Sequence, residues 1–165
     1  MRLEQTRYDN SETGCCARLD RKLWDRRELA WTDKLFLKDH IRSLLHIPIN
    51  FGSVISHDQA AVQQAEAYPE EPFWITDEVS PWGADIYLAV DRPVPGARTE
   101  RLSGKFFCRV FEGPYRNVSK WVREMEQHVA KRGQHLEKMY FYYPYCPKCA
   151  KQFGKNEVVL LAQTE

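Results

Sequence analysis

The chain has 165 residues and a formal net charge of +1, because 24 Lys and Arg residues oppose 23 Asp and Glu residues; this near balance argues against nucleic-acid binding by bulk electrostatic attraction. Hydrophobic residues make up 43 % and charged residues 28 %, which is ordinary for a soluble globular chain of about one domain. No apolar run approaches the roughly 20 residues of a membrane-spanning helix, so neither nucleic acid nor a membrane is an expected partner.

The first 32 residues are predicted to form a charged extension. Residues 1–11 lack the apolar stretch of a secretory signal. We therefore expect a cytoplasmic protein whose five cysteines are thiols or metal ligands and not a disulfide framework. Residues 18–28 are dense in charge, and the few apolar residues among them predict only a short, weak helix.

Residues 33–165 are predicted to form the main domain, and its first half combines helices with strands. Asp33 is the expected N-cap of a helix that Pro48 ends, because apolar residues follow at intervals of one helix face. These residues are Leu37, Ile41, Leu44 and Leu45. We expect a strand over 47–55, a helix starting at Ser56 or Asp58, and strands over 73–78 and 86–90.

The second half has a clearer pattern. A linker is expected over residues 91–104, which contain two prolines and two glycines. The pattern then predicts a strand over 105–112, a helix that Gly133 ends, and strands over 140–145 and 156–163. The two halves, 47–90 and 105–163, therefore share the order strand, helix, strand, strand. We expect one α+β domain made of two pseudo-symmetric βαββ units with a mainly antiparallel sheet.

The run Phe111-Glu112-Gly113-Pro114-Tyr115 ends a predicted strand and opens a helix that carries Trp121. It resembles the Gly-Pro-Tyr turn of the GyrI-like small-molecule-binding family, which has the effector-binding-domain fold of multidrug regulators. The resemblance covers about residue 47 to the C-terminus and implies a stand-alone member. It further implies a cleft between the two halves that binds bulky organic compounds against aromatic side chains and a buried acid. Residues 139–143, where many binding members carry that acid, contain none.

Seven aromatic residues are the candidate ligand contacts. They are Trp74, Trp82, Tyr87, Phe111, Tyr115, Tyr140 and Tyr142. Aromatic side chains offer large contact areas and, for cations, a π face. The alternative is that most of them form the core, as we expect for Trp121. Trp74 and Trp82 flank a turn and a polar strand face, which favours them as ligand contacts.

Two acids, Glu78 and Glu112, are the candidate catalytic groups. In an aromatic cleft, desolvation would raise the pKa of a carboxyl group and suit it to general acid–base catalysis. Glu78 shares its predicted strand face with Trp74, and Glu112 directly precedes the Gly-Pro-Tyr turn. On a solvent face each would be an ordinary surface residue, as would Glu157, a third acid on a predicted strand.

The sharpest local motif is Cys146-Pro147-Lys148-Cys149. Two thiolates at this spacing can hold one tetrahedral zinc ion, and Cys15 and Cys16 could supply the remaining ligands. The alternatives are a turn with two ordinary thiols and a redox pair, although the βαβ setting typical of redox motifs is missing from the pattern.

The sequence thus supports three functions. The first is binding of a small aromatic or hydrophobic molecule, with no cofactor required. The second is hydrolysis of strained or electrophilic small molecules, which the GyrI-like resemblance implies for some stand-alone members and in which a carboxylate would activate water. The third is a zinc-stabilised interaction module. We expect a monomer or a homodimer.

Overall fold

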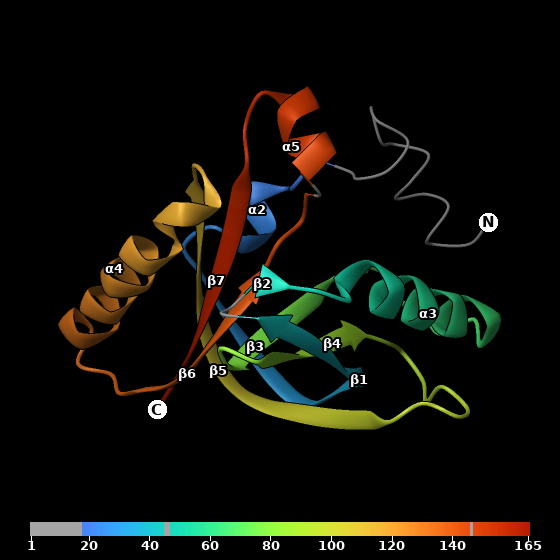
Figure 1. The fold of residues 1–165 in the computed structure, drawn as a ribbon. Coiled ribbons are helices and arrows are strands. Elements are labelled where there is room, and N and C mark those ends of the chain that lie inside the picture. Colours follow the sequence, from blue (N-terminus) through green and yellow to red (C-terminus); the bar gives the residue numbers. More distant parts are fainter. Residues whose placement is uncertain (1–17, 45–46, 146) are drawn as a thin grey trace. The chain divides into compact units, whose positions relative to one another are not determined.

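The computed structural model describes residues 18–44, 47–145 and 147–165, and the chain divides into two compact units (Figure 1). Among the described residues, the first unit comprises 32–103, and the second comprises 18–31 together with 104–165. Two long strands, β1 (Arg27–Leu44) and β5 (Thr99–Glu112), each contribute residues to both units. Each unit has a hydrophobic core of its own.

The described part of the first unit is an antiparallel sheet with one helix. Its other elements are β2 (Ile47–Pro48), α3 (Phe51–Gln64), β3 (Trp74–Ser80) and β4 (Gly83–Ala89). The strand order is β2-β1-β4-β3. In the register of β1 and β4, Leu37 lies opposite Leu88 and Ile41 lies opposite Ala84.

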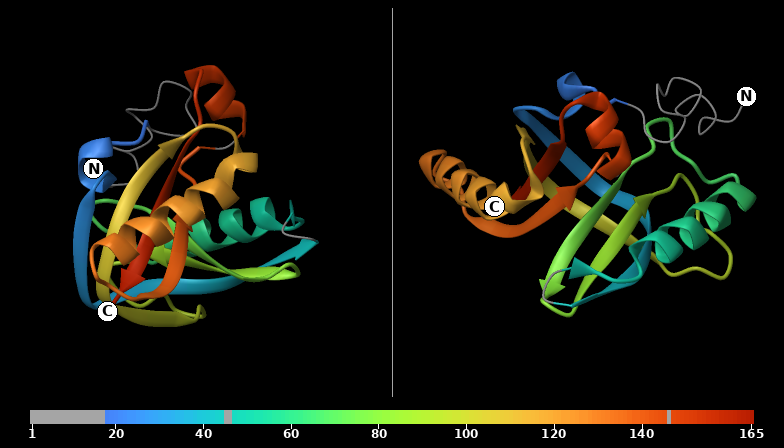
Figure 2. Two further views of the ribbon diagram at one scale, coloured as in Figure 1. Left: turned by 90° about the vertical axis from the view of Figure 1, so that its left-hand side faces the viewer. Right: turned by 45° about the horizontal axis from the view of Figure 1, so that its top comes forward.

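The helix α3 covers one face of this sheet (Figure 2). Val62 of α3 is buried in one cluster with Leu37, Ile41, Ile86 and Leu88. Successive strand residues point to opposite faces, so their neighbours form the other face, which we call the α3-distal face. It carries Phe36, Lys38, His40, Asp85 and Tyr87. The face beneath α3 therefore holds the core cluster, and the α3-distal face carries Lys38, His40 and Asp85.

The second unit repeats this plan with β5, α4 (Val118–Lys131), β6 (Leu136–Tyr142) and β7 (Glu157–Thr164). The strand order is β6-β7-β5, and both pairs are antiparallel. A 3₁₀ turn, η1 (Tyr115–Asn117), precedes α4, and a short helix, α5 (Pro147–Phe153), precedes β7. The face under α4 is a core of aromatic and branched side chains: Phe107, Phe111, Trp121, Met125, Val129, Phe141, Val158, Leu160 and Ala162.

Gly113 makes the predicted Gly-Pro-Tyr turn possible. Its φ is +145°, a backbone conformation that L side chains rarely adopt. A Cβ atom there would also lie 3.2 Å from Cζ2 of Trp121. Trp121 in turn stacks on Phe111, with ring centroids 5.6 Å apart. The turn thus brings the start of α4 against the end of β5, and the core position expected for Trp121 is confirmed.

The predicted helix of the extension is α2 (Arg21–Trp24), and it belongs to the second unit. Asp20 caps it by accepting a hydrogen bond from Lys22 N at 3.0 Å. The Trp24 ring lies 5.4 Å from that of Tyr142. Asp25 Oδ1 accepts a hydrogen bond from the backbone N of Val110 at 3.0 Å. The predicted boundary between the extension and the main domain, at residue 32, lies within the strand β1.

The predicted fold class is confirmed. The elements β1-α3-β3-β4 and β5-α4-β6-β7 are two βαββ repeats of an α+β protein with antiparallel pairing within each unit. None of the described helices is both long and apolar enough to cross a membrane.

The helix predicted after Asp33 is wrong, because this segment belongs to β1. Residues four positions apart share a face in a helix and also in a strand. The spacing of Leu37 and Ile41 therefore fitted both structures. Pairing with β4 decides between them, because it places both side chains in the core beneath α3.

Three other boundaries also differ from the prediction. Within residues 47–55 only Ile47–Pro48 is a strand, and α3 begins at Phe51 with Asn50 as its N-cap. The predicted linker over 91–104 is shorter, because residues 99–104 already belong to β5. The strand predicted at 140–145 begins earlier and ends earlier, at Leu136–Tyr142.

Candidate functional site

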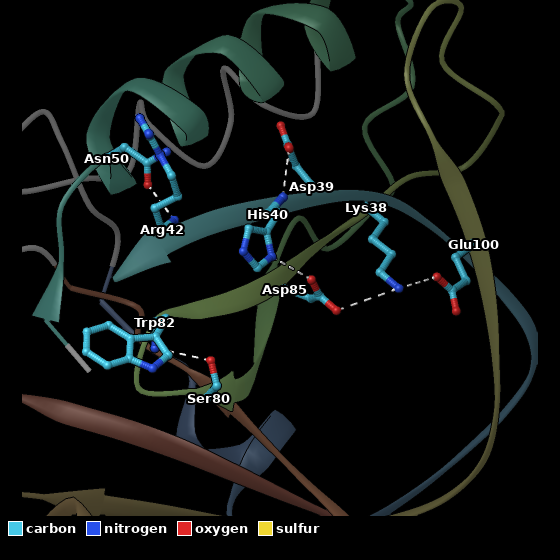
Figure 3. Close-up of polar contacts among 9 residues, drawn as sticks. All are labelled: Lys38, Asp39, His40, Arg42, Asn50, Ser80, Trp82, Asp85 and Glu100. Atoms are coloured by element: carbon cyan, nitrogen blue, oxygen red, sulfur yellow. Dashed lines mark hydrogen bonds and ion pairs between the residues drawn. The ribbon is translucent and has the colours of Figure 1, made fainter. Parts of the chain in front are cut away.

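Asp85 is the centre of a charged cluster on the α3-distal face (Figure 3). A different basic side chain lies next to each of its two carboxylate oxygens. His40 Nδ1 lies 3.0 Å from Oδ1, and Lys38 Nζ lies 3.7 Å from Oδ2. Lys38 and His40 are two residues apart on β1, so the strand period places both on the α3-distal face, where they lie opposite Tyr87 and Asp85 of β4. The Asp85 side chain remains 23 % exposed. It is therefore held in place and still reaches solvent.

Lys38 is a fixed positive charge in this cluster. Its Nζ lies 2.9 Å from Glu100 Oε2 and 5.3 Å from the centroid of the Tyr87 ring. The hydrogen bond to Glu100 raises the pKa of Lys38, despite an opposing effect of burial. For Tyr87 the effect of burial is the reverse: it raises the pKa of the phenol, which therefore stays neutral. Lys38 thus links two carboxylates and keeps its charge at physiological pH.

The turn between β3 and β4 places an indole next to this cluster. Trp82 is 60 % exposed, and its carbonyl oxygen accepts a hydrogen bond from Ser43 N at 2.8 Å. It directly precedes Gly83, over which the His40 ring lies. A Cβ atom on Gly83 would come within 2.5 Å of His40 Nε2. The α3-distal face therefore combines a carboxylate, two basic groups and exposed aromatic surface (Figure 3).

A second carboxylate, Glu157, lies at the start of β7 and is almost completely buried, with 1 % of its side chain exposed. The Tyr145 hydroxyl donates a hydrogen bond to Oε1 at 3.0 Å. Arg21 Nη1 lies 3.4 Å from Oε2, and Lys155 Nζ lies 3.5 Å from Oε1. Leu19 N donates to the Tyr145 hydroxyl at 2.7 Å. The two basic side chains balance the negative charge of the Glu157 carboxylate. The network also joins the segment around α2 to β7.

Glu157 belongs to the sheet face opposite α4, which we call the α4-distal face. This face is lined by buried residues: Phe106, Cys108, Val110, Tyr140, Tyr142, Val159 and Leu161. Trp31 covers Phe106 with ring centroids 4.4 Å apart, and Trp24 covers Tyr142. Burial raises the pKa of the Cys108 thiol to about 12, so this thiol is a poor nucleophile. This face is packed, in contrast to the surroundings of Asp85.

The predicted catalytic acids, Glu78 and Glu112, are both exposed, on β3 and β5 respectively. Glu78 is exposed on β3 beyond Asp77, where the register with β4 shifts. Glu112 is the last residue of β5, lies opposite Glu157 in the register, and is exposed. Their role as catalytic groups stays a prediction.

The predicted ligand contacts are divided between the two units. Trp74 packs against Phe51 of α3, with ring centroids 5.3 Å apart, and Phe111 lies in the core under α4. Tyr115 is exposed at η1, and its hydroxyl donates to the carbonyl oxygen of Tyr145 at 3.0 Å. Tyr140 and Tyr142 are buried on the α4-distal face. Within the first unit, Trp82 and Tyr87 of the predicted set neighbour or belong to the Asp85 cluster.

The predicted zinc ligands fall mostly outside the described residues, which exclude Cys15, Cys16 and Cys146. Cys149 is described and is fully buried in α5. The zinc site that these cysteines indicate stays a prediction.

Sequence reasoning missed Asp85, Lys38 and the role of His40. The available signal was the position of Lys38 and His40 between the apolar residues Leu37 and Ile41. Read with a period of two, it places Lys38 and His40 on one face. The helical interpretation of the same residues concealed this pair.

Comparison with solved structures defines the class of fold. A structure titled an uncharacterized conserved protein from Listeria innocua has a TM-score of 0.65 at 13 % identity, covering 86 % of this chain and 93 % of that one. A hydrolase from Listeria innocua has a TM-score of 0.61 at 13 % identity with the same coverage. The EcmrR C-terminal domain has a TM-score of 0.62 at 11 % identity, covering 87 % of this chain and 98 % of that one. At these identities the likeness shows a shared fold.

The family is shown by sequence. The profile of the bacterial hydrolase family matches residues 6–164. The chain therefore belongs to the bacterial hydrolase family. No curated protein matches it.

Proposed function

We propose that the protein hydrolyses a small electrophilic organic compound on the α3-distal face, with Asp85 as the general base. The observation that carries this proposal is the held but exposed Asp85 carboxylate, with Lys38 and His40 on its two oxygens. A general base must be positioned and must also reach water or substrate. Among the strand carboxylates described above, Asp85 combines both conditions.

The reaction is an addition of water to a polar or strained bond. Asp85 accepts a proton from a water molecule, and the water oxygen forms a bond to the electrophilic carbon. The bond from that carbon to its leaving atom breaks, and the electron pair goes to the leaving atom. That atom then takes the proton from Asp85, which restores the carboxylate. The fixed charge of Lys38 stabilises the negative charge that develops beside it.

Aromatic groups at the site supply affinity for the organic part of the substrate. Trp82 offers exposed indole surface beside the β4 strand, whereas Tyr87, on the same face as Asp85, is buried and holds Lys38 against its ring. The match to the bacterial hydrolase family supports turnover. The resemblance of the Gly-Pro-Tyr segment to GyrI-like proteins supports a small organic substrate.

The test is turnover of a panel containing 4-nitrophenyl acetate and styrene oxide as an ester and a strained ring. We expect the Asp85→Asn variant to lose a factor of about 100 to 10,000 in kcat, because it removes the base. Glu78→Gln and Glu112→Gln are matched controls that should keep their activity. Turnover that survives in Asp85→Asn and disappears in either control would overturn the assignment.

Binding without turnover is the second candidate, and the exposed indole of Trp82 favours it. Saturable quenching of tryptophan fluorescence by 1-naphthol, together with the absence of product from every panel member, would support it over hydrolysis.

A further inference from the structure

A second polar cluster lies on the opposite side of β1, between that strand and α3. Asp39 of β1 meets His57 and Asp58, which are neighbours in α3. One ligand atom from each of the three side chains lies within 4.8 Å of those of the other two. Figure 3 shows Asp39 on the α3 side of the strand, away from His40 and Asp85. The cluster is therefore separate from the proposed hydrolytic site.

Asp58 is the unusual member, because it is 3 % exposed and lacks a full set of hydrogen bonds. Its Oδ1 lies 3.3 Å from His57 Nδ1. Its Oδ2 is buried and has no hydrogen-bond partner among the described residues. A buried carboxylate oxygen without a donor is costly. A charged ligand at this position would remove that cost.

Asp39 adds a second negative charge. Its Oδ1 accepts a hydrogen bond from His40 N at 2.7 Å, which fixes the carboxylate beside Asp58. Two carboxylates are thus held together without enough positive charge from the protein.

We propose that Asp39, His57 and Asp58 bind a divalent first-row transition-metal ion that links β1 to α3. Two carboxylates and an imidazole suit ions such as Zn²⁺ and Co²⁺, whereas Ca²⁺ and Mg²⁺ prefer oxygen ligands alone. Metal–ligand bonds of about 2.0–2.2 Å require ligand atoms to approach to roughly 3–3.5 Å. The His57 side chain is 81 % exposed and can rotate to meet this requirement. Water completes the coordination.

The test is titration of the full-length metal-free protein with Co²⁺, followed by visible absorption. We expect one ion per chain with weak d–d bands from oxygen and nitrogen ligands. His57→Gln and Asp58→Asn should each weaken binding at least tenfold. His135→Gln, which alters another exposed histidine, is the matched control and should bind like wild type.

The outcomes separate this site from the cysteines. An intense sulfur-to-metal charge-transfer band that persists in His57→Gln would assign the ion to thiolates and overturn the proposal. Equal Co²⁺ affinity in wild type, His57→Gln and Asp58→Asn would also overturn it, as would no binding at millimolar Co²⁺. If Asp58→Asn fails to fold by circular dichroism, His57→Gln decides, because its exposed side chain is removable without disturbing the core.

Discussion

Asp85 and Glu157 lie on the last strand of their respective βαββ repeats, and each is held by two basic groups with a tyrosine nearby. The two carboxylates differ in their exposure to solvent. Asp85 keeps 23 % of its side chain exposed, whereas Glu157 keeps 1 %. Arg21 and the Tyr145 hydroxyl close the surroundings of Glu157, and α2 carries Arg21 there. The comparison teaches that pairing with cations does not by itself mark a catalytic carboxylate, since solvent access must accompany it.

The largest expected effect is on turnover. Asp85→Asn should lower kcat by about 100- to 10,000-fold, and Glu157→Gln should leave kcat within about threefold of wild type. The reason is that only Asp85 reaches water. Steady-state kinetics on the substrate panel checks both values. Equal losses in the two variants would remove the functional difference between the carboxylates.

For the free energy of unfolding, we expect a larger effect from replacing Glu157 than from replacing Asp85. Glu157→Ala should lower the free energy of unfolding by about 3 kcal/mol, because it leaves the Tyr145 hydroxyl and two basic groups without their buried acceptor. Asp85→Ala should cost less than about 1 kcal/mol, since its ion pairs are partly exposed. Urea unfolding followed by circular dichroism measures both. A larger loss for Asp85→Ala would contradict the structural role assigned to Glu157.

Ligand contact should also differ between the two faces. Trp82→Ala should weaken binding of 1-naphthol by roughly 1 kcal/mol, with little change in stability, because its indole is exposed. Tyr142→Phe is the matched control on the buried α4-distal face and should leave this affinity unchanged. Fluorescence titration measures both dissociation constants. The expectation fails if Trp82→Ala binds the probe as tightly as wild type.

The smallest effect concerns alkaline pH. Burial raises the pKa of Tyr145 to about 12 from a usual 10.0. The unfolded chain therefore releases this proton first, and the stabilisation present below pH 10 is lost as pH rises toward 12. From pH 9 to 11 the Tyr145 contribution should fall by about 1 kcal/mol. Urea unfolding at both pH values should show a smaller loss for Tyr145→Phe than for wild type; an identical loss would refute the assignment.

The repeated βαββ order and the turn at Gly113 were predictable from sequence, because α4 has a clear apolar stripe and Gly113 precedes a proline. The first repeat was harder. Leu37 and Ile41 fit a helix or a strand equally well, and the choice depends on β4, which is distant in sequence. Local periodicity cannot supply that pairing.

The candidate site was less predictable than the fold. Trp82 and Tyr87 were identified from their aromatic character, but Asp85 resembles other surface acids in the sequence. Its distinction comes from Lys38 and His40 on another strand. Glu157 was considered a surface residue, and its burial depends on Arg21 and Tyr145, which are also distant in sequence. Cross-strand contacts of this kind have no local sequence signal.

The hydrogen bond from Leu19 N to the Tyr145 hydroxyl spans 126 positions of the chain and has a consequence during synthesis. A ribosome adds about 5–20 residues per second. The segment around α2 therefore emerges several seconds before Tyr145 and Glu157 exist to receive it. During that interval Trp24 has no Tyr142 to cover and Arg21 has no carboxylate to bind. The N-terminal segment can dock only after nearly the whole chain has been synthesised. Its docking is therefore one of the last steps of folding on the ribosome.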